Sequence, residues 1–340
     1  MSNQKSALTI IIICILCLLV GILTNITMSI KKDEANSNAR PPKSKSAVFS
    51  YSANKIAMIT LSGAIDSDYE QSGYFGNKAY SAESVRRLLK KAYSDDSVKG
   101  VLLRINSPGG TVGMSQEIYS LIMKMRKKKP VVVSMGDVAA SGGYYISSAA
   151  DRIYAYPGTI TGSIGVIFSS YDANELFTKK LGIKASPIKS GKYKDIGSMY
   201  RPMTKEEREL LQRTINISYE QFLSDITKGR IYRQDKYKAP KRYLSSRDLR
   251  KYADGRIFTG EEARDLGFVD ALGGLEDAHG AFKQILGKEY PLINYSKPSN
   301  FSSIFSSMSE AFMDKKTEAS YEQYLPFGVS HRNQILYMWE

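Results

Sequence analysis

Gly100-Val-Leu-Leu-Arg-Ile-Asn-Ser-Pro-Gly-Gly110 is an apolar strand that runs into a glycine turn, and Val131-Val-Val-Ser-Met-Gly-Asp-Val-Ala-Ala-Ser-Gly-Gly143 has the same pattern. Between the two stretches, residues 112–128 have the apolar spacing of a helix. Strands that alternate with helices form parallel sheets, and reactive groups gather at the carboxyl ends of such strands. We therefore expect an α/β fold with flanking helices, in which both glycine turns lie at one edge of the sheet.

The same spacing rules predict the other elements. A capping box, Thr204-Lys-Glu-Glu207, opens a long helix that ends near Ile226. The remaining expected elements are strands at 56–61, 152–156, 164–168 and 184–189, and helices at 82–92, 173–181, 261–266 and 275–286.

An uncharged apolar segment near the N-terminus predicts attachment to a membrane. Residues 7–30 contain no charged side chain, and as a helix they would span about 36 Å, more than the hydrocarbon core of a bilayer. The alternative is a cleaved signal peptide, but no small-x-small cleavage pattern follows the segment. We therefore expect an uncleaved single-pass transmembrane helix. The chain's two cysteines, Cys14 and Cys17, both lie inside it, so the rest of the chain has no cysteine. This absence fits an extracytoplasmic domain without disulfides, although many cytosolic domains also lack cysteine.

The rest of the chain divides by composition into four parts. We expect residues 1–6 to be a cytoplasmic N-terminus and residues 31–52, rich in Ser, Asn and Lys, to be a flexible linker. Residues 53–287 have the periodicity of one folded domain, and residues 288–340 have the composition of a C-terminal tail with an aromatic end.

The formal net charge of +14 predicts an anionic partner. Nucleic acid is one alternative. However, the densest basic run, 124–129, directly precedes Pro130 at a helix C-terminus, where cations are favoured in any protein. We therefore expect anionic membrane lipid as a partner of the basic surface and no nucleic acid.

Ser141 is the candidate nucleophile, because it lies among small residues at the end of an apolar strand and is followed by Gly-Gly. The backbone amides of Gly142, Gly109 and Gly110 are candidate donors to an oxyanion, since glycine lets a substrate come close. The alternative interpretation of each Gly-Gly pair is a tight structural turn.

The candidate base is a lysine rather than a histidine. The chain has only two histidines, His279 and His331, and both lie far downstream in unremarkable contexts. The stretch 189–195 contains Lys189, Lys192 and Lys194, and a desolvated lysine loses its proton more easily. Sequence alone does not choose among the three, and a solvated lysine-rich loop is the alternative.

Ser163, in Gly158-Thr-Ile-Thr-Gly-Ser-Ile-Gly165, could hold the amine of such a lysine by a hydrogen bond, or it could cap a turn. The sequence has no phosphate loop, dinucleotide motif or metal-ligand pattern, so we expect neither a cofactor nor a metal.

Five motifs, in order, resemble those of the bacterial signal peptide peptidase A family, peptidase family S49, of the half-length membrane-anchored type found in Gram-positive bacteria. The resemblance covers about residues 52–287. The motifs are Asn106-Ser-Pro-Gly-Gly110, Ala140-Ser-Gly-Gly-Tyr144, Thr161-Gly-Ser-Ile-Gly-Val166, Ser190-Gly-Lys-Tyr-Lys-Asp195 and Ala253-Asp-Gly-Arg-Ile-Phe-Thr-Gly260.

The resemblance implies a ClpP/crotonase-like fold and a Ser/Lys dyad. By motif position, Ser141 is the nucleophile and Lys194 the general base, although Lys192 lies only two residues away. Ser163 corresponds to the serine that holds the lysine, and the oxyanion donors are the amides around Gly109, Gly110 and Gly142.

The resemblance also implies a homo-oligomeric ring, commonly an octamer, in which serine and lysine meet across a subunit boundary. The expected substrates are remnant signal peptides, hydrolysed through an acyl-enzyme by an extracytoplasmic domain at the cell membrane. The alternatives are a ClpP-like membrane protease of one anchored protein, a catalytically silent peptide-binding scaffold and an acyl-CoA enzyme of the crotonase type. The aromatic end, residues 321–339, could act as a self-inhibitor or be trimmed by the enzyme.

Overall fold

The computed structural model describes residues 54–66, 80–231, 244–296 and 336–338, all of which belong to one compact unit, Ser52–Glu340. The predicted N-terminus, anchor and linker, and most of the tail, lie outside the described residues. None of the helices within these described ranges is long and apolar enough to cross a membrane.

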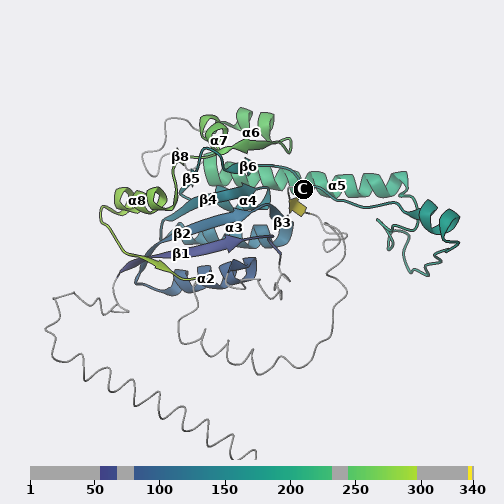
Figure 1. The fold of residues 1–340 in the computed structure, drawn as a ribbon, viewed down its shortest axis with the longest axis horizontal. Helices are drawn as coiled ribbons and strands as arrows, with labels where there is room; N and C mark the ends of the chain where they lie inside the picture. The colour runs from purple at the N-terminus through teal and green to yellow at the C-terminus, as the bar shows by residue number, and fades with distance from the viewer. Residues whose placement is uncertain (1–53, 67–79, 232–243, 297–335, 339–340) are drawn as a thin grey trace, which may run out of the picture. The chain divides into compact units, whose positions relative to one another are not determined.

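The described residues form a mixed α/β fold (Figure 1). Its strands are β1 (Lys55–Ser62), β2 (Val98–Ser107), β3 (Gly109–Thr111), β4 (Val131–Ala140), β5 (Arg152–Ala155), β6 (Ile160–Gly162), β7 (Ile257–Thr259), β8 (Ala271–Leu272), β9 (Leu292–Asn294) and β10 (Leu336–Met338). Its α-helices are α2 (Ala82–Ser94), α3 (Val112–Met125), α4 (Gly142–Ser148), α5 (Lys205–Ile226), α6 (Ser246–Tyr252), α7 (Gly260–Leu266) and α8 (Leu275–Leu286), with π-helical turns η2 (Leu176–Lys180) and η3 (Thr227–Ile231).

The main sheet is mostly parallel, as the sequence predicts. Its strand order is β7-β6-β4-β2-β1-β9, and only the β6–β7 pair at one edge is antiparallel. The first half of β4 pairs with β5 and the second half with β6, so the sheet divides along this strand. The carboxyl ends of β2 and β4, which carry the two glycine turns, therefore lie next to each other.

Both faces of the central strands are buried, which explains why the strands are continuous apolar runs. On β2, Leu103 packs into the larger core together with residues of α2, α3 and α4, whereas Leu102 faces the opposite layer and packs with Phe282 of α8. A side chain at Gly100 would collide with the Phe282 ring, so glycine is needed for this close approach. Each large buried side chain stabilises the fold by about 1.5–3 kcal/mol.

Two predicted strands are wrong. The first is the strand expected at 164–168. The strand found in this region, β6, lies earlier and ends at Gly162, because Gly162 and Ser163 have positive φ angles of 82° and 49° that an extended chain cannot continue. Residues 184–189 form no strand and are exposed, so their apolar residues pack against no surface of the described residues. Residues 176–180 of the predicted helix at 173–181 form the π-helical turn η2.

A buried ion pair fixes the segment after α5. The guanidinium of Arg230 donates to both oxygens of Asp270, at 2.7 and 2.9 Å, and the side chains are 8% and 10% exposed. Arg230→Ala leaves a buried carboxylate without its cation, so we expect the free energy of unfolding to fall by about 3–5 kcal/mol in denaturant titration. The matched control, Arg264→Ala, removes an exposed pair with Glu261 and should cost under about 1 kcal/mol. Equal losses in the two variants would contradict this prediction.

Candidate active site

Ser141 occupies a sharp turn between β4 and α4. Its φ and ψ angles are 52° and −115°, a conformation that non-glycine residues rarely adopt and that resembles the nucleophile elbow of other hydrolases. The residue is 1% exposed, and within the described part of the chain its hydroxyl has no hydrogen-bond partner. A buried hydroxyl without a partner is unfavourable by about 1–3 kcal/mol, which is typical of a functional rather than a structural position.

The strand register brings Ser163 beside Ser141. Ala140 pairs with Gly162 at the parallel ends of β4 and β6, and the Ser141 amide donates to the Gly162 carbonyl at 2.8 Å. Ser163 also has a positive φ and is 6% exposed, and its amide donates to the Arg256 carbonyl. Two serines in left-handed backbone therefore follow the ends of two neighbouring strands.

The first glycine turn forms β3, which follows the carboxyl end of β2 at the same edge of the sheet. A Cβ on Gly110 would come within 2.2 Å of the Ile65 carbonyl oxygen, so only glycine fits here. Ile65 donates to the Gly109 carbonyl at 2.8 Å and accepts from the Thr111 amide at 2.7 Å. Since alternate groups of a strand point to opposite sides, the Gly110 amide points away from Ile65.

The three predicted oxyanion donors differ in their bonding. The Gly109 amide already donates to the Ser107 hydroxyl at 3.2 Å. Gly142 is the first residue of α4, and an amide in that position has no acceptor within its own helix. The Gly109 amide is thus bonded within its own turn, whereas that of Gly142 has no acceptor in its helix and that of Gly110 faces the edge of β3 that pairs with β10.

The second edge of β3 is occupied by the chain's own C-terminal segment. β10 pairs with β3 in antiparallel register, with Tyr337 opposite Gly110 and Met338 opposite Gly109. An extended peptide that pairs with an exposed strand edge is a common mode of peptide recognition. The strand next to the Ser141 turn can thus hold a peptide backbone.

The helix that follows Ser141 is fixed by a polar network that sequence reasoning missed. All seven residues of α4 are buried, and the Tyr145 hydroxyl donates a short hydrogen bond to the Asp225 carboxylate of α5. Asp225 also accepts from Gln221 at 2.8 Å and from Lys228 at 3.0 Å. The spacing of Gln221, Asp225 and Lys228 at i, i+4 and i+7 places them on one helix face, but nothing in the sequence connects that face to Tyr145.

The structure does not bring the candidate lysines to Ser141 within one chain. They lie on residues 165–206, a segment we call the arm, which connects β6 to α5 and contains no buried residue (Figure 1). Several of its apolar side chains are open to solvent, and Leu176, Leu181, Ile183 and Ile188 are 50–103% exposed. The arm thus presents an apolar surface that no described part of its own chain covers.

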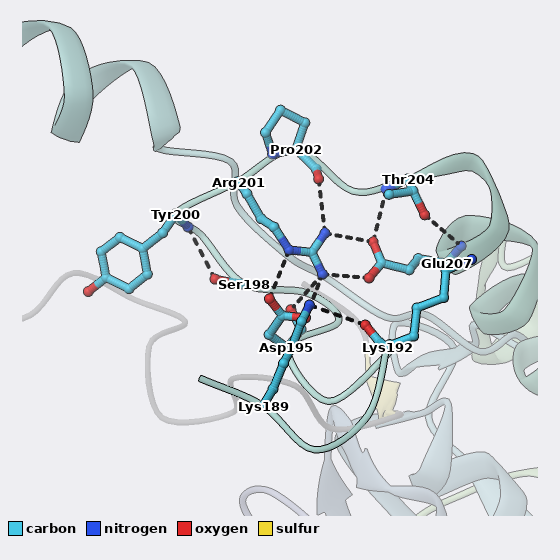
Figure 2. Close-up of polar contacts among 9 residues, drawn as sticks. All are labelled: Lys189, Lys192, Asp195, Ser198, Tyr200, Arg201, Pro202, Thr204 and Glu207. Carbon is cyan, nitrogen blue, oxygen red and sulfur yellow. Dashed lines mark hydrogen bonds and ion pairs between the residues drawn. The ribbon is translucent and has the colours of Figure 1, made fainter. Parts of the chain in front are cut away.

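The three candidate lysines, all on the arm, have different surroundings. The Lys189 ammonium lies 2.5 Å from a carboxylate oxygen of Asp195 and is held there (Figure 2). That of Lys192 lies 5.2 Å from the centre of the Tyr193 ring, a cation–π distance. For the Lys194 side chain, the described residues provide no hydrogen bond or ion pair. Of the three, Lys194 is the one whose side chain has no such contact within the described residues.

His279 has its partner outside this site. A ring nitrogen of His279 lies 2.9 Å from the carbonyl oxygen of Tyr290, at the end of the segment that follows α8. His331 lies outside the described residues.

Comparison with known proteins agrees with this geometry. The family model of peptidase family S49 matches residues 123–288, and the Clp protease model matches residues 76–169. Three relatives illustrate the similarity. A protein assigned as a protease in Methanocaldococcus jannaschii is 40% identical over 74% of this chain and 77% of its own length. One assigned as a protease in Synechocystis is 42% identical over 66% and 72%. One assigned as a signal peptide peptidase in Enterococcus faecium is 35% identical over 68% and 64%.

These matches include the β4–Ser141–α4 turn, the β6 turn and the arm. The chain belongs to peptidase family S49 and is a serine protease.

Proposed function

We propose that the protein is a membrane-anchored endopeptidase that hydrolyses remnant signal peptides with a dyad of Ser141 and Lys194. The observation that carries the proposal is the Ser141 hydroxyl, which is buried, has no hydrogen-bond partner within the described residues and is held in a strained turn directly before Gly142. Strain and unmet hydrogen bonding are retained where they serve a reaction.

The proposed reaction follows from the groups at the carboxyl ends of β2, β4 and β6 together with the lysine of the arm. The neutral Lys194 amine takes the proton of the Ser141 hydroxyl as its oxygen attacks the peptide carbonyl, and the amides of Gly110 and Gly142 donate to the resulting oxyanion. Ser163 orients the amine. The lysine then gives its proton to the leaving amine, which releases one product and leaves an acyl ester on Ser141. Water, activated by the same amine, hydrolyses the ester and restores the enzyme.

The lysine comes from a neighbouring subunit in this proposal. Ser141 is buried in the body of the chain, whereas Lys194 lies on the exposed arm, and no contact joins them within the described residues. The uncovered apolar side chains of the arm fit a surface between subunits. The match to the Clp protease model favours an oligomer, and we propose a ring of eight subunits.

The substrate class follows from the strand edge and the membrane anchor. A peptide paired with β3 is bound mainly through its backbone, so an extended apolar segment is accepted without a fixed sequence. Remnant signal peptides are extended and apolar when they leave the bilayer. The predicted anchor at residues 7–30 keeps the extracytoplasmic domain at the cell membrane, and the net charge of +14 attracts it to anionic lipid.

The test uses the purified full-length protein in detergent. We expect it to cleave peptides that correspond to signal-peptide apolar cores, and a serine-reactive phosphonate to label Ser141. Cleavage of a folded anchored protein but not of free peptides would favour the alternative of a dedicated membrane protease. Peptide binding with neither labelling nor cleavage would mean a silent scaffold.

The pairing of β10 with β3 predicts that the C-terminal segment regulates the enzyme. A strand of the same chain competes for the substrate edge at high effective concentration. Removal of residues 321–340 is therefore expected to raise kcat/KM for short peptides several-fold. Mass spectrometry of the wild type and the Ser141→Ala variant tests trimming, because only an active enzyme can shorten its own tail. Identical C-termini in the two proteins would contradict trimming, and an unchanged kcat/KM would contradict inhibition.

A further inference from the structure

One guanidinium joins the loop that carries Lys194 to the start of α5 (Figure 2). Arg201 donates to both oxygens of Asp195, at 2.8 and 2.9 Å, and to both oxygens of Glu207, at 2.5 and 2.8 Å. It also donates to the Pro202 carbonyl at 3.2 Å. The guanidinium fork is therefore fully used, with one carboxylate on each side.

Glu207 is the fixed end of this connection. Its side chain is 3% exposed, and it closes the capping box of α5 by accepting from the Thr204 amide at 2.9 Å. Hydrogen bonding to Arg201 lowers its pKa to about 2, so the carboxylate stays charged at neutral pH. The far end of α5 is packed in the core and bonded through Asp225 to the helix that follows Ser141. The connection thus begins on an element that is rigidly joined to the core of the subunit that supplies Lys194.

Asp195 is the other end of this connection, and it directly follows Lys194 in the chain. Its side chain is 14% exposed, although the residues before it, 181–194, are all exposed. Three successive turns surround it, closed by the Lys194, Ile196 and Ser198 amides. Adjacent Cα atoms lie about 3.8 Å apart, so fixing Asp195 also fixes the backbone of Lys194. Since no other bond of the described chain holds the Lys194 side chain, this backbone position decides where its amine is presented.

The charges of the cluster have a second consequence. Asp195 and Glu207 are balanced by Arg201 and Lys189, and the bonds from Arg201 and then Lys189 hold the pKa of Asp195 well below its usual range. An unbalanced carboxylate next to Lys194 would favour the ammonium form of that lysine, which cannot act as a base. The neighbour of the candidate base is thus a carboxylate whose charge is already neutralised.

We propose that Arg201 is a positioning residue for the catalytic lysine: by binding Asp195 and Glu207 together, it fixes the loop that presents Lys194. The proposal rests on the proposed function, in which Lys194 is the base. A lysine at position 201 would keep the charge but could not bind two carboxylates through a planar fork. Misplacement of a catalytic group lowers the rate of the chemical step much more than it lowers substrate binding.

The test measures peptide hydrolysis by full-length Arg201→Met in two backgrounds, the wild type and Lys194→Ala. We expect kcat to fall about 10- to 100-fold in the wild-type background, with KM changed less than about twofold. In the Lys194→Ala background, where hydrolysis falls to the background rate, the readout is the slow residual labelling of Ser141 by the serine-reactive phosphonate. Its rate should be unchanged, because a residue that acts only through Lys194 has nothing left to position. Arg201→Lys should recover only part of the loss.

Arg208→Met is the matched control. Arg208 is an exposed arginine on the first turn of α5, close in sequence to Arg201, and it has no ion pair in the described residues. Its loss should therefore leave kcat unchanged. A similar loss for Arg208→Met and Arg201→Met would overturn the proposal, because it would mean a general effect of surface charge. An equal loss in both backgrounds, or a change confined to KM, would overturn it as well.

Two further results separate the possible failures. Wild-type activity of Lys194→Ala alone would contradict the proposed base, whereas an inactive Lys194→Ala with a fully active Arg201→Met would contradict only the positioning role. If Arg201→Met does not assemble, Asp195→Asn goes through the same two backgrounds. This variant keeps the size of the side chain and removes only the charge that Arg201 binds. A loss confined to the wild-type background supports the positioning role, and an equal loss in both backgrounds overturns it.

Discussion

Replacement of Ser141 by alanine is expected to lower peptide hydrolysis by a factor on the order of 10⁵, to the background of the assay. The hydroxyl is the group that bonds to the substrate carbonyl, and Ser163, the serine nearest to it in the strand register, sits at the end of a different strand. Single-turnover kinetics with a fluorogenic apolar peptide measure the loss. A variant that keeps more than about 1% of the wild-type kcat would contradict the role of Ser141.

The same variant is expected to be more stable than the wild type, which distinguishes a lost nucleophile from a damaged fold. Alanine removes a buried hydroxyl that has no partner, so the free energy of unfolding should rise by roughly 1 kcal/mol. Ser148→Ala is the control on the same helix. Its hydroxyl donates to the Tyr145 carbonyl at 2.7 Å, so this variant should lose about 0.5–1.5 kcal/mol and remain active. Loss of stability in Ser141→Ala would mean that the hydroxyl has a structural partner.

The parts of the structure that could be predicted from the sequence are those governed by local rules. Apolar runs followed by glycine turns predicted β2, β4 and their neighbouring carboxyl ends, and the capping box predicted the start of α5. The position of Ser141 at a strand-to-helix turn follows from the small residues around it, because a larger side chain cannot pack there. At Gly143, for example, a Cβ would lie 2.9 Å from the Ser107 carbonyl oxygen.

The parts that could not be predicted depend on contacts between distant residues. The apolar alternation at 184–189 indicated a strand, but a strand needs a partner, and the described chain offers none. Likewise, the link between Tyr145 and Asp225 joins residues 80 positions apart, and no local pattern records it. Lys189, Lys192 and Lys194 look alike in the sequence, and only the fold of the arm shows that Asp195 engages Lys189.

Mixing two inactive proteins, Ser141→Ala and Lys194→Ala, is expected to restore hydrolysis. In the proposed ring, each site takes its serine from one subunit and its lysine from the next. A site is complete wherever a Lys194→Ala subunit provides the serine and a Ser141→Ala neighbour provides the lysine. With equal amounts and random assembly, about a quarter of the sites meet this condition, because the interface is head-to-tail and each of its two sides is chosen independently.

The experiment co-expresses the two variants with different tags and purifies particles that carry both, so that every particle tested is mixed. Each variant alone is the control and should show only the background rate. The double variant Ser141→Ala/Lys194→Ala, mixed with wild-type subunits, should lower activity to the square of the wild-type fraction, because both sides of an active site must then come from wild-type subunits. Mixed particles without activity would contradict a dyad shared between subunits. The arm would then have to fold back onto its own chain, and its exposed apolar side chains would need another explanation.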